Sequence, residues 1–88
     1  MNVYVMNECI CKICGYDIYP DKFREGDTPT YIICPCCGAE SGYEDSTPKS
    51  IENCRQKWID NQMIWFDKSI KPANWDFKQQ IENIKKKN

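Results

Sequence analysis

The cysteines of this chain are grouped closely enough to carry out chemistry together. The sequence has seven cysteines, and three of them lie within the four residues Cys34-Pro35-Cys36-Cys37. Thiols this close together can bind a metal ion, form disulfides or act as nucleophiles. Because seven is an odd number, an all-disulfide arrangement leaves one thiol over, so a disulfide framework is the weaker interpretation.

The spacing of the cysteines favours a metal site. Residues 11–15 read CKICG, and residues 34–38 read CPCCG, which is a second CxxCG if Cys36 is passed over. Nineteen residues separate Cys14 from Cys34, within the connection of about 15–20 residues that is typical of four-cysteine sites. Two thiolates across a tight turn can point at one ion, and the glycine after each motif suits a left-handed backbone position. The sequence therefore predicts one metal ion with four ligands, Cys11, Cys14, Cys34 and Cys37.

The remaining cysteines and the redox alternative carry less weight. Cys9 and Cys36 fall outside the ligand register and Cys54 lies in a helical stretch, so we expect all three to act as small buried or shielding hydrophobic residues. A redox-active CPxC of thioredoxin type needs a helix directly after the motif. Here Gly38 and Ser41-Gly42 interrupt any such helix. Thiol oxidoreductase chemistry remains an alternative.

Strands are expected in the first half and helices in the second. Residues 3–11 and 28–34 are β-prone, and the segment between them is mostly a polar loop. Ser46-Thr47-Pro48 is a helix start signal, and an apolar stripe after it predicts a helix over 48–67. A second helix is predicted over 76–86, capped by Asn74 or Asp76. The two apolar stripes consist of Ile51, Cys54, Trp58 and Trp65, and of Phe77, Ile81 and Ile84.

The two CxxCG motifs resemble the knuckles of rubredoxins and of the wider rubredoxin-like zinc ribbons. The likeness covers residues 9–43, and Tyr16 and Pro20 add to it. It implies metal ligation by the same four cysteines. The chain departs from rubredoxins in its shorter connection, in its helical tail, and in Ile32, where rubredoxins usually have an aromatic residue. The whole chain is also similar to short bacterial cysteine-rich proteins with CxxCG, CPCCG and a late NWD, a resemblance that implies an architecture and no activity.

We therefore expect a small α+β domain that is stabilised by a metal ion. A chain of 88 residues buries a modest fraction of its surface and is often held together by something besides its core. The predicted architecture is one domain over 1–88, with a rubredoxin-like zinc ribbon of short antiparallel strands at 9–45. The helices at 48–67 and 76–86 are expected to form an extension packed on that ribbon.

Charge and composition limit the kinds of partner that the chain can bind. Residues 1–50 hold four basic against eight acidic side chains, and residues 51–88 hold eight against five. Four thiolates on a divalent ion would make the ribbon still more negative, so nucleic-acid binding through it is disfavoured. Residues 1–6 lack the features of a signal peptide, and no segment approaches the roughly 20 apolar residues of a membrane span. We therefore expect a cytoplasmic protein with reduced thiols and no membrane contact.

Few residues favour catalysis. The chain has no histidine, which removes a histidine base and an open histidine-ligated zinc site. Four cysteines close the coordination shell of a zinc ion, whereas a catalytic zinc keeps one position open. Glu40, Glu44 and Asp45 are expected to form a solvated acidic rim beside the metal site.

The sequence thus predicts a non-catalytic zinc-binding module that contacts another protein. A rubredoxin-type iron electron carrier is the alternative, because four thiolates accept either ion. Five large aromatics lie within residues 58–77, more than one stripe can easily hide in a small domain. Of these we expect Trp75 to be the exposed anchor for a partner.

Overall fold

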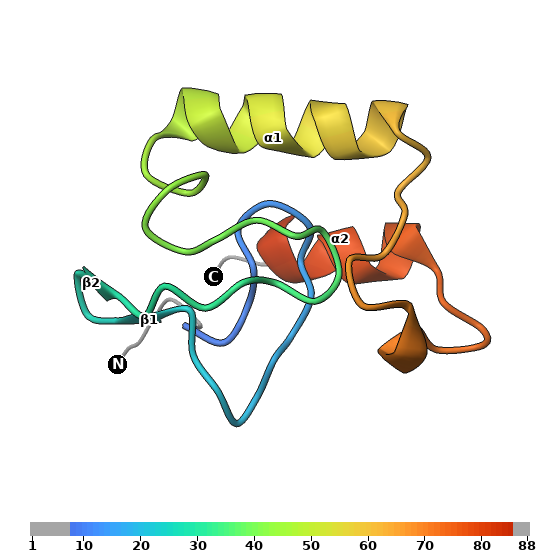
Figure 1. Ribbon diagram of the computed structural model, residues 1–88, viewed down its shortest axis with the longest axis horizontal. Helices are drawn as coiled ribbons and strands as arrows, with labels where there is room; N and C mark the ends of the chain where they lie inside the picture. Colours follow the sequence, from blue (N-terminus) through green and yellow to red (C-terminus); the bar gives the residue numbers. More distant parts are fainter. Residues whose placement is uncertain (1–7, 86–88) are drawn as a thin grey trace.

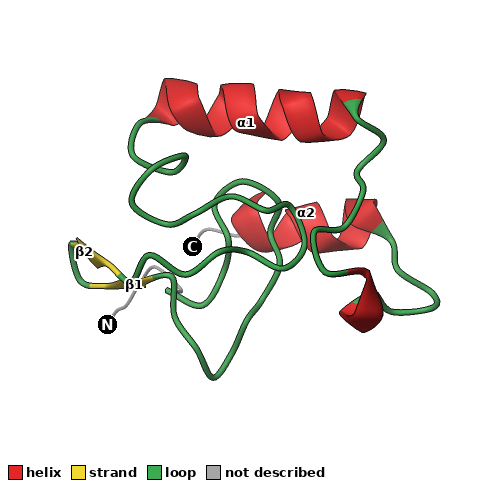
Figure 2. Ribbon diagram, viewed as in Figure 1, coloured by secondary structure: helices red, strands yellow, loops and turns green. Residues whose placement is uncertain are grey.

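Two short strands and two helices surround the cysteine loops in the computed structural model, which describes residues 8–85 (Figure 1). Strands β1 (Arg24–Glu25) and β2 (Thr28–Pro29) pair antiparallel, with Arg24 opposite Pro29. Helices α1 (Pro48–Asp60) and α2 (Phe77–Lys85) follow, with a 3-10 helix, η1 (Lys68–Ile70), between them. Figure 2 shows that turns and loops make up most of the chain before α1. The fold is therefore α+β, as the sequence predicts.

The strands are much shorter than the sequence predicts. Residues 3–7 lie outside the described part of the chain, and of 28–34 only Thr28–Pro29 forms a strand. The reason is Tyr31, whose φ of 63° interrupts the extended backbone. Beyond it, Ile33 makes only an isolated antiparallel bridge with Glu40. The predicted antiparallel pairing is confirmed, but the predicted strand lengths are wrong.

Helix α1 begins where the sequence predicts and ends seven residues earlier than the predicted Asp67. Thr47 caps it by accepting the Ser50 N–H at 3.0 Å, and Pro48 takes a first-turn position where its missing N–H costs nothing. At the other end the N–H of Gln62 donates to the Ile59 carbonyl and that of Met63 to the Trp58 carbonyl. With Gln62 at φ 67°, these are the two bonds of a Schellman motif, which terminates the helix.

Helix α2 begins one residue later than predicted. Its cap is Asp76, whose Oδ1 accepts the Lys78 N–H at 2.9 Å, rather than Asn74. Residue 86, the predicted last residue of this helix, lies outside the described range. Phe77, Ile81 and Ile84 are all partly buried on it, in agreement with the predicted apolar face.

The core joins the cysteine loops to the helices. In Figure 1, α1 runs along one side of the loops and α2 lies beside them. Trp58 of α1 and Trp65, which follows that helix, are 6% and 2% exposed and belong to the same buried cluster as the cysteines. The cluster consists of Cys11, Ile13, Cys14, Phe23, Cys34, Cys36, Ala39, Trp58 and Trp65. Within residues 8–85, the helices are too short or too polar to cross a membrane.

Candidate metal centre

The two CxxCG motifs fold into the same turn. We call residues 11–16 the first knuckle and residues 34–39 the second knuckle. In each, the glycine has a left-handed backbone, with φ of 86° at Gly15 and 82° at Gly38, as the sequence predicts. An isolated bridge closes the base of each, Ile10 with Asp17 and Ile33 with Glu40. The matching hydrogen bonds are Gly15 N–H to Cys11 O (2.9 Å), Cys11 N–H to Tyr16 O (2.8 Å), Gly38 N–H to Cys34 O (2.9 Å) and Cys34 N–H to Ala39 O (2.8 Å).

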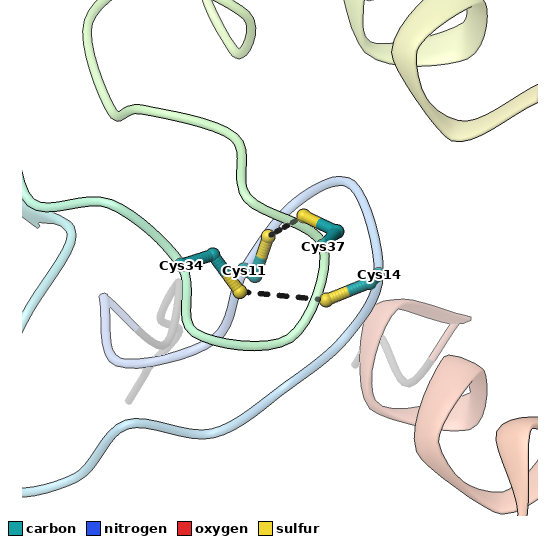
Figure 3. Close-up of side chains that lie close together, drawn as sticks. All are labelled: Cys11, Cys14, Cys34 and Cys37. Atoms are coloured by element: carbon teal, nitrogen blue, oxygen red, sulfur yellow. Dashed lines mark hydrogen bonds between the residues drawn. The ribbon is translucent and has the colours of Figure 1, made fainter. Parts of the chain in front are cut away.

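The two knuckles bring the four predicted cysteines together. The sulfur atoms of Cys11, Cys14, Cys34 and Cys37 all lie within 4.8 Å of one another (Figure 3). Cys11 Sγ is 3.7 Å from Cys37 Sγ, and Cys14 Sγ is 3.6 Å from Cys34 Sγ. Three of the four residues are buried and Cys37 is partly buried. A cluster of this kind could hold a metal ion.

The distances fit a tetrahedral ion better than disulfides. With metal–sulfur bonds of about 2.3 Å, the edge of a regular tetrahedron is about 3.8 Å, close to both measured separations. A disulfide requires about 2.05 Å between the sulfurs, and none of the seven cysteines, all of which lie within the described residues, forms a disulfide. The donor set of four sulfurs suits soft or borderline ions such as zinc and iron.

The thiols perturb one another strongly. Hydrogen bonds from neighbouring thiols, that of Cys11 first, lower the pKa of Cys34, and the backbone N–H of Cys37 contributes to this. The same hydrogen bonding, again with Cys11 first, raises the pKa of Cys14 and of Cys37. Four thiols this close together resist ionising at the same time, because neighbouring thiolates repel one another. A bound cation would remove that resistance, so metal binding should release protons.

The internal repeat explains two of the three remaining cysteines. Adding 23 to a residue number in the first knuckle gives its counterpart in the second, as Cys11 and Cys34 show. Cys36 is then the counterpart of Ile13, and the two are 0% and 1% exposed. Cys9 corresponds to Ile32, and the carbonyl of each accepts a hydrogen bond from a backbone N–H that follows its own knuckle. Cys36 thus occupies a position for a buried hydrophobic side chain, in line with the sequence prediction.

Cys54 lies apart from the four clustered sulfurs on α1. It is partly buried against the core, and burial raises the pKa of its thiol. This fits the predicted role of a small packing residue.

Side chains of both helices hold the first knuckle in place. Arg55 of α1 donates from Nε to the Ile13 carbonyl at 2.7 Å and from Nη2 to the Lys12 carbonyl at 2.8 Å. On α2, Gln80 Nε2 and Asn83 Nδ2 donate to the carbonyls of the next two residues, Cys14 (3.0 Å) and Gly15 (2.8 Å). Four consecutive knuckle carbonyls are therefore bound by the helices. Sequence reasoning missed these residues, although Gln80 and Asn83 lie one turn apart next to the apolar stripe of α2.

A backbone segment after α1 covers the second knuckle. The N–H groups of Phe66 and Asp67 donate to the carbonyls of Cys36 (2.9 Å) and Pro35 (2.8 Å). The Phe66 ring lies over the glycine of that knuckle, 3.3 Å from the place where a Cβ on Gly38 would be. Both knuckles are thus tied to the second half of the chain, which positions their sulfurs.

Two of the three carboxylates, those of Asp45 and Glu44, are not the free solvated groups that the sequence predicts. Asp45 is 8% exposed, and its Oδ1 accepts Arg24 Nη2 and the Gly42 N–H, both at 2.8 Å. Glu44 is partly buried and accepts the Glu40 N–H at 2.8 Å. The prediction failed because Arg24, 21 residues earlier in the chain, is brought beside Asp45 by the fold.

Trp75 is not the exposed aromatic that the sequence predicts. It is partly buried, and its ring centroid lies 5.5 Å from that of Trp65 and 6.1 Å from that of Trp58. Its Nε1 donates to Gln80 Oε1 at 2.7 Å. Phe66, at 65% exposed, is the most exposed large hydrophobic residue between residues 58 and 77. An exposed Trp75 ring is therefore not available as an anchor for a partner.

Comparison of the chain with family models, with curated proteins and with solved structures finds no match.

Proposed function

We propose that this chain is a non-catalytic zinc-binding module whose ion organises a rubredoxin-like ribbon, and that the module contacts another protein. The observation that carries the proposal is the group of four cysteine sulfurs within 4.8 Å of one another. Four thiolates satisfy the tetrahedral preference of zinc completely, and we favour zinc over iron because Ile32 stands where rubredoxins usually have an aromatic residue. When bound, it would supply the cross-link between the two knuckles that a disulfide supplies in other small domains.

Several contacts support a structural role for the ion. Between residue 8 and the start of α1, only four residues form strands, so few backbone bonds hold the two knuckles against each other. Their carbonyls bind Arg55, Gln80 and Asn83 of the helices. An ion that fixes the knuckles therefore also fixes the surface on which the helices dock, and its binding energy becomes folding energy.

The surroundings of the motifs favour a module without catalysis. Residues 34–37 lie in a turn, and no helix begins at them in the described chain, in contrast to a redox-active CPxC. Asp45 is engaged in an ion pair and Glu44 in a backbone hydrogen bond. We place the module in the cytoplasm, where thiols stay reduced and available to a metal.

Metal analysis of the purified protein tests the proposal. Protein from cells grown with both zinc and iron should contain one zinc per chain and be colourless. Cys11→Ser should lose the ion and unfold the knuckles, as should chelation at neutral pH. One iron per chain, a red colour and a reversible one-electron wave would instead establish the electron-carrier alternative. Protein that folds equally well without any metal would contradict both.

A further inference from the structure

Two tyrosines form an exposed aromatic pair next to the second knuckle. Tyr31 and Tyr43 are 56% and 62% exposed, and their ring centroids lie 6.3 Å apart with a 56° tilt. Tyr31 precedes the strand-like residues that enter the knuckle, and Tyr43 follows those that leave it. In Figure 1 this part of the chain lies toward the β1–β2 hairpin, away from η1.

The backbone of Tyr31 is held in a conformation that bulky residues avoid. Its φ is 63°, in the left-handed region, which is a true outlier for a large side chain. Ser41, only 2% exposed, holds it there, because its Oγ accepts the Tyr31 N–H at 2.7 Å. Strain of this kind persists only where the surroundings enforce it, and it is concentrated at functional sites.

A glycine makes room for the Tyr31 ring. A Cβ on Gly42 would lie 2.9 Å from Tyr31 Cε1 and 3.0 Å from Pro29 Cβ, so no larger residue fits. The ring therefore lies against the backbone at Gly42, which Pro29 at the end of β2 also approaches. Tyr31 remains more than half exposed in this position, so burial in the core does not explain its left-handed backbone.

The chain segment that carries the pair is acidic in sequence. Residues 24–47 contain five carboxylates and one basic side chain, Arg24. Arg24 pairs with Asp45, which is buried. The other ion pair of the described residues joins Lys22 to Glu8. Four carboxylates of this region thus remain outside any ion pair within residues 8–85, those of Glu25, Asp27, Glu40 and Glu44.

We propose that Tyr31 and Tyr43 form a docking surface for a cationic, arginine-rich segment of a partner protein. The proposal rests on the protein-contact role proposed above and names the chemistry of the partner. A guanidinium is attracted to an aromatic face within about 6 Å of its centroid, and the two rings are close enough to share one. The four carboxylates draw the same cation in and repel phosphate backbones and anionic lipids.

The metal site bears on this surface directly. Ile33 bridges Glu40, and the Ser41 N–H donates to the Ile32 carbonyl at 3.0 Å. These contacts join the segment that follows Tyr31 to the segment that precedes Tyr43. Cys34 and Cys37 lie in the knuckle that connects these two segments. Removing the ion should therefore loosen the two segments and weaken binding at the tyrosine pair.

Binding of an oligo-arginine peptide to the metal-loaded protein, followed by tyrosine and tryptophan fluorescence, tests the proposal. Tyr31→Gly removes the ring and suits the left-handed backbone, so its thermal midpoint should equal or exceed that of the parent protein. Its affinity should fall about fivefold, as should that of Tyr43→Ala, since each loses one ring–cation contact. Tyr19→Ala is the control, because Tyr19 is 78% exposed in another loop. Glu40→Gln should weaken binding and reduce its salt dependence.

The outcomes separate this inference from the proposed function. Unchanged affinity in both Tyr31→Gly and Tyr43→Ala would overturn the docking surface, as would equal binding of an oligo-glutamate peptide. If only Glu40→Gln lost affinity, peptide binding would depend on charge alone, and the tyrosine docking surface would again be overturned. Metal content is measured on the same samples, so a wrong or missing metal would refute the zinc module independently of the peptide result.

Discussion

Gly15 touches the backbone of Gln80 so closely that no side chain fits between them. A Cβ on Gly15 would overlap the Gln80 carbonyl oxygen, and would lie 3.1 Å from the carbonyl carbon and 3.3 Å from Ile81 Cα. The first knuckle and α2 are therefore in direct backbone contact. The Asn83 side chain donates to the Gly15 carbonyl at 2.8 Å on the same surface. Gly15 thus has two roles. It adopts the left-handed conformation of the turn, and it lets α2 pack directly on the backbone of the knuckle.

Gly15→Ala should destabilise the protein by about 3 kcal/mol or more, since it adds a backbone clash to the cost of a left-handed alanine. Gly26→Ala is a matched control, because Gly26 has a φ of 66° but a Cβ there would meet nothing within 4 Å. It should lose only about 1–2 kcal/mol. Urea unfolding of both metal-loaded variants measures the difference. Equal losses would mean that α2 does not pack on the knuckle in this way.

Trp75→Ala should be strongly destabilising, by about 3–5 kcal/mol. The ring packs against Trp58, Trp65 and Phe77, and its N–H binds Gln80, which in turn binds the first knuckle. Thermal unfolding followed by far-UV circular dichroism measures the loss.

Phe66→Ala provides the comparison for that experiment. Its ring is 65% exposed, and the hydrogen bonds of its backbone survive the substitution. We expect a loss of about 1 kcal/mol or less. If Phe66→Ala proved the more damaging of the two, the packing described for the tryptophans would be wrong.

Asp45→Ala should cost about 3 kcal/mol. The carboxylate is buried, and its removal leaves the Gly42 N–H and Arg24 Nη2 without their acceptor. Arg24 Nε already has no hydrogen-bond partner, so the guanidinium would keep only the 3.3 Å bond from Nη1 to the Asp27 carbonyl within residues 8–85. Glu25→Ala, at an exposed position of the neighbouring strand, should change the free energy of unfolding by less than about 0.5 kcal/mol. Chemical denaturation compares them, and similar values for both would refute a structural role for the Arg24–Asp45 pair.

What the sequence predicts best are the features that depend on neighbouring residues. The two CxxCG turns follow from local spacing, and the start of α1 follows from the Thr47-Pro48 pair, whose capping chemistry is complete within a few residues. The clustering of four sulfurs then needs only that two similar turns face each other.

The failures concern contacts that no local pattern encodes. Helix α1 ends at a left-handed Gln62, where a glycine would have marked the stop. Asp45 looked solvated because its partner, Arg24, lies 21 residues away in the sequence. Trp75 looked exposed because Pro72 and Asn74 suggest a turn, yet the fold closes that turn onto two other tryptophans.

Alkaline pH should weaken the fold through Tyr16. Burial, followed by the charges of Cys34 and Cys36, raises the pKa of this phenol above its ordinary value of 10.0. The folded state therefore holds the Tyr16 proton more tightly than the unfolded state. This contribution is fully present below pH 10 and is lost as the pH rises through the folded-state pKa. Tyr16→Phe should show a smaller fall in unfolding free energy between neutral and strongly alkaline pH than the parent protein does. An identical pH profile for the two proteins would contradict this prediction.

The choice between Cys36 and Cys37 as a metal ligand is the sharpest test of the site. The internal repeat makes Cys36 the counterpart of the buried Ile13, whereas Cys37 Sγ lies 3.7 Å from Cys11 Sγ. Cys36→Val should therefore keep one ion per chain, because a branched apolar side chain replaces a buried thiol in a position built for one. Cys37→Ser should lose at least tenfold in metal affinity, since the hydroxyl is a poor substitute for a thiolate ligand.

Cys54→Ala, on α1 and outside the four-sulfur cluster, is the control for that experiment and should retain the ion. Metal content and competition with a chromophoric chelator measure all three variants. Retention of the metal by Cys37→Ser together with its release from Cys36→Val would show that the second knuckle binds through Cys34 and Cys36. In that case the two knuckles would differ in ligand spacing, and the backbone repeat that relates Ile13 to Cys36 would have no bearing on the metal.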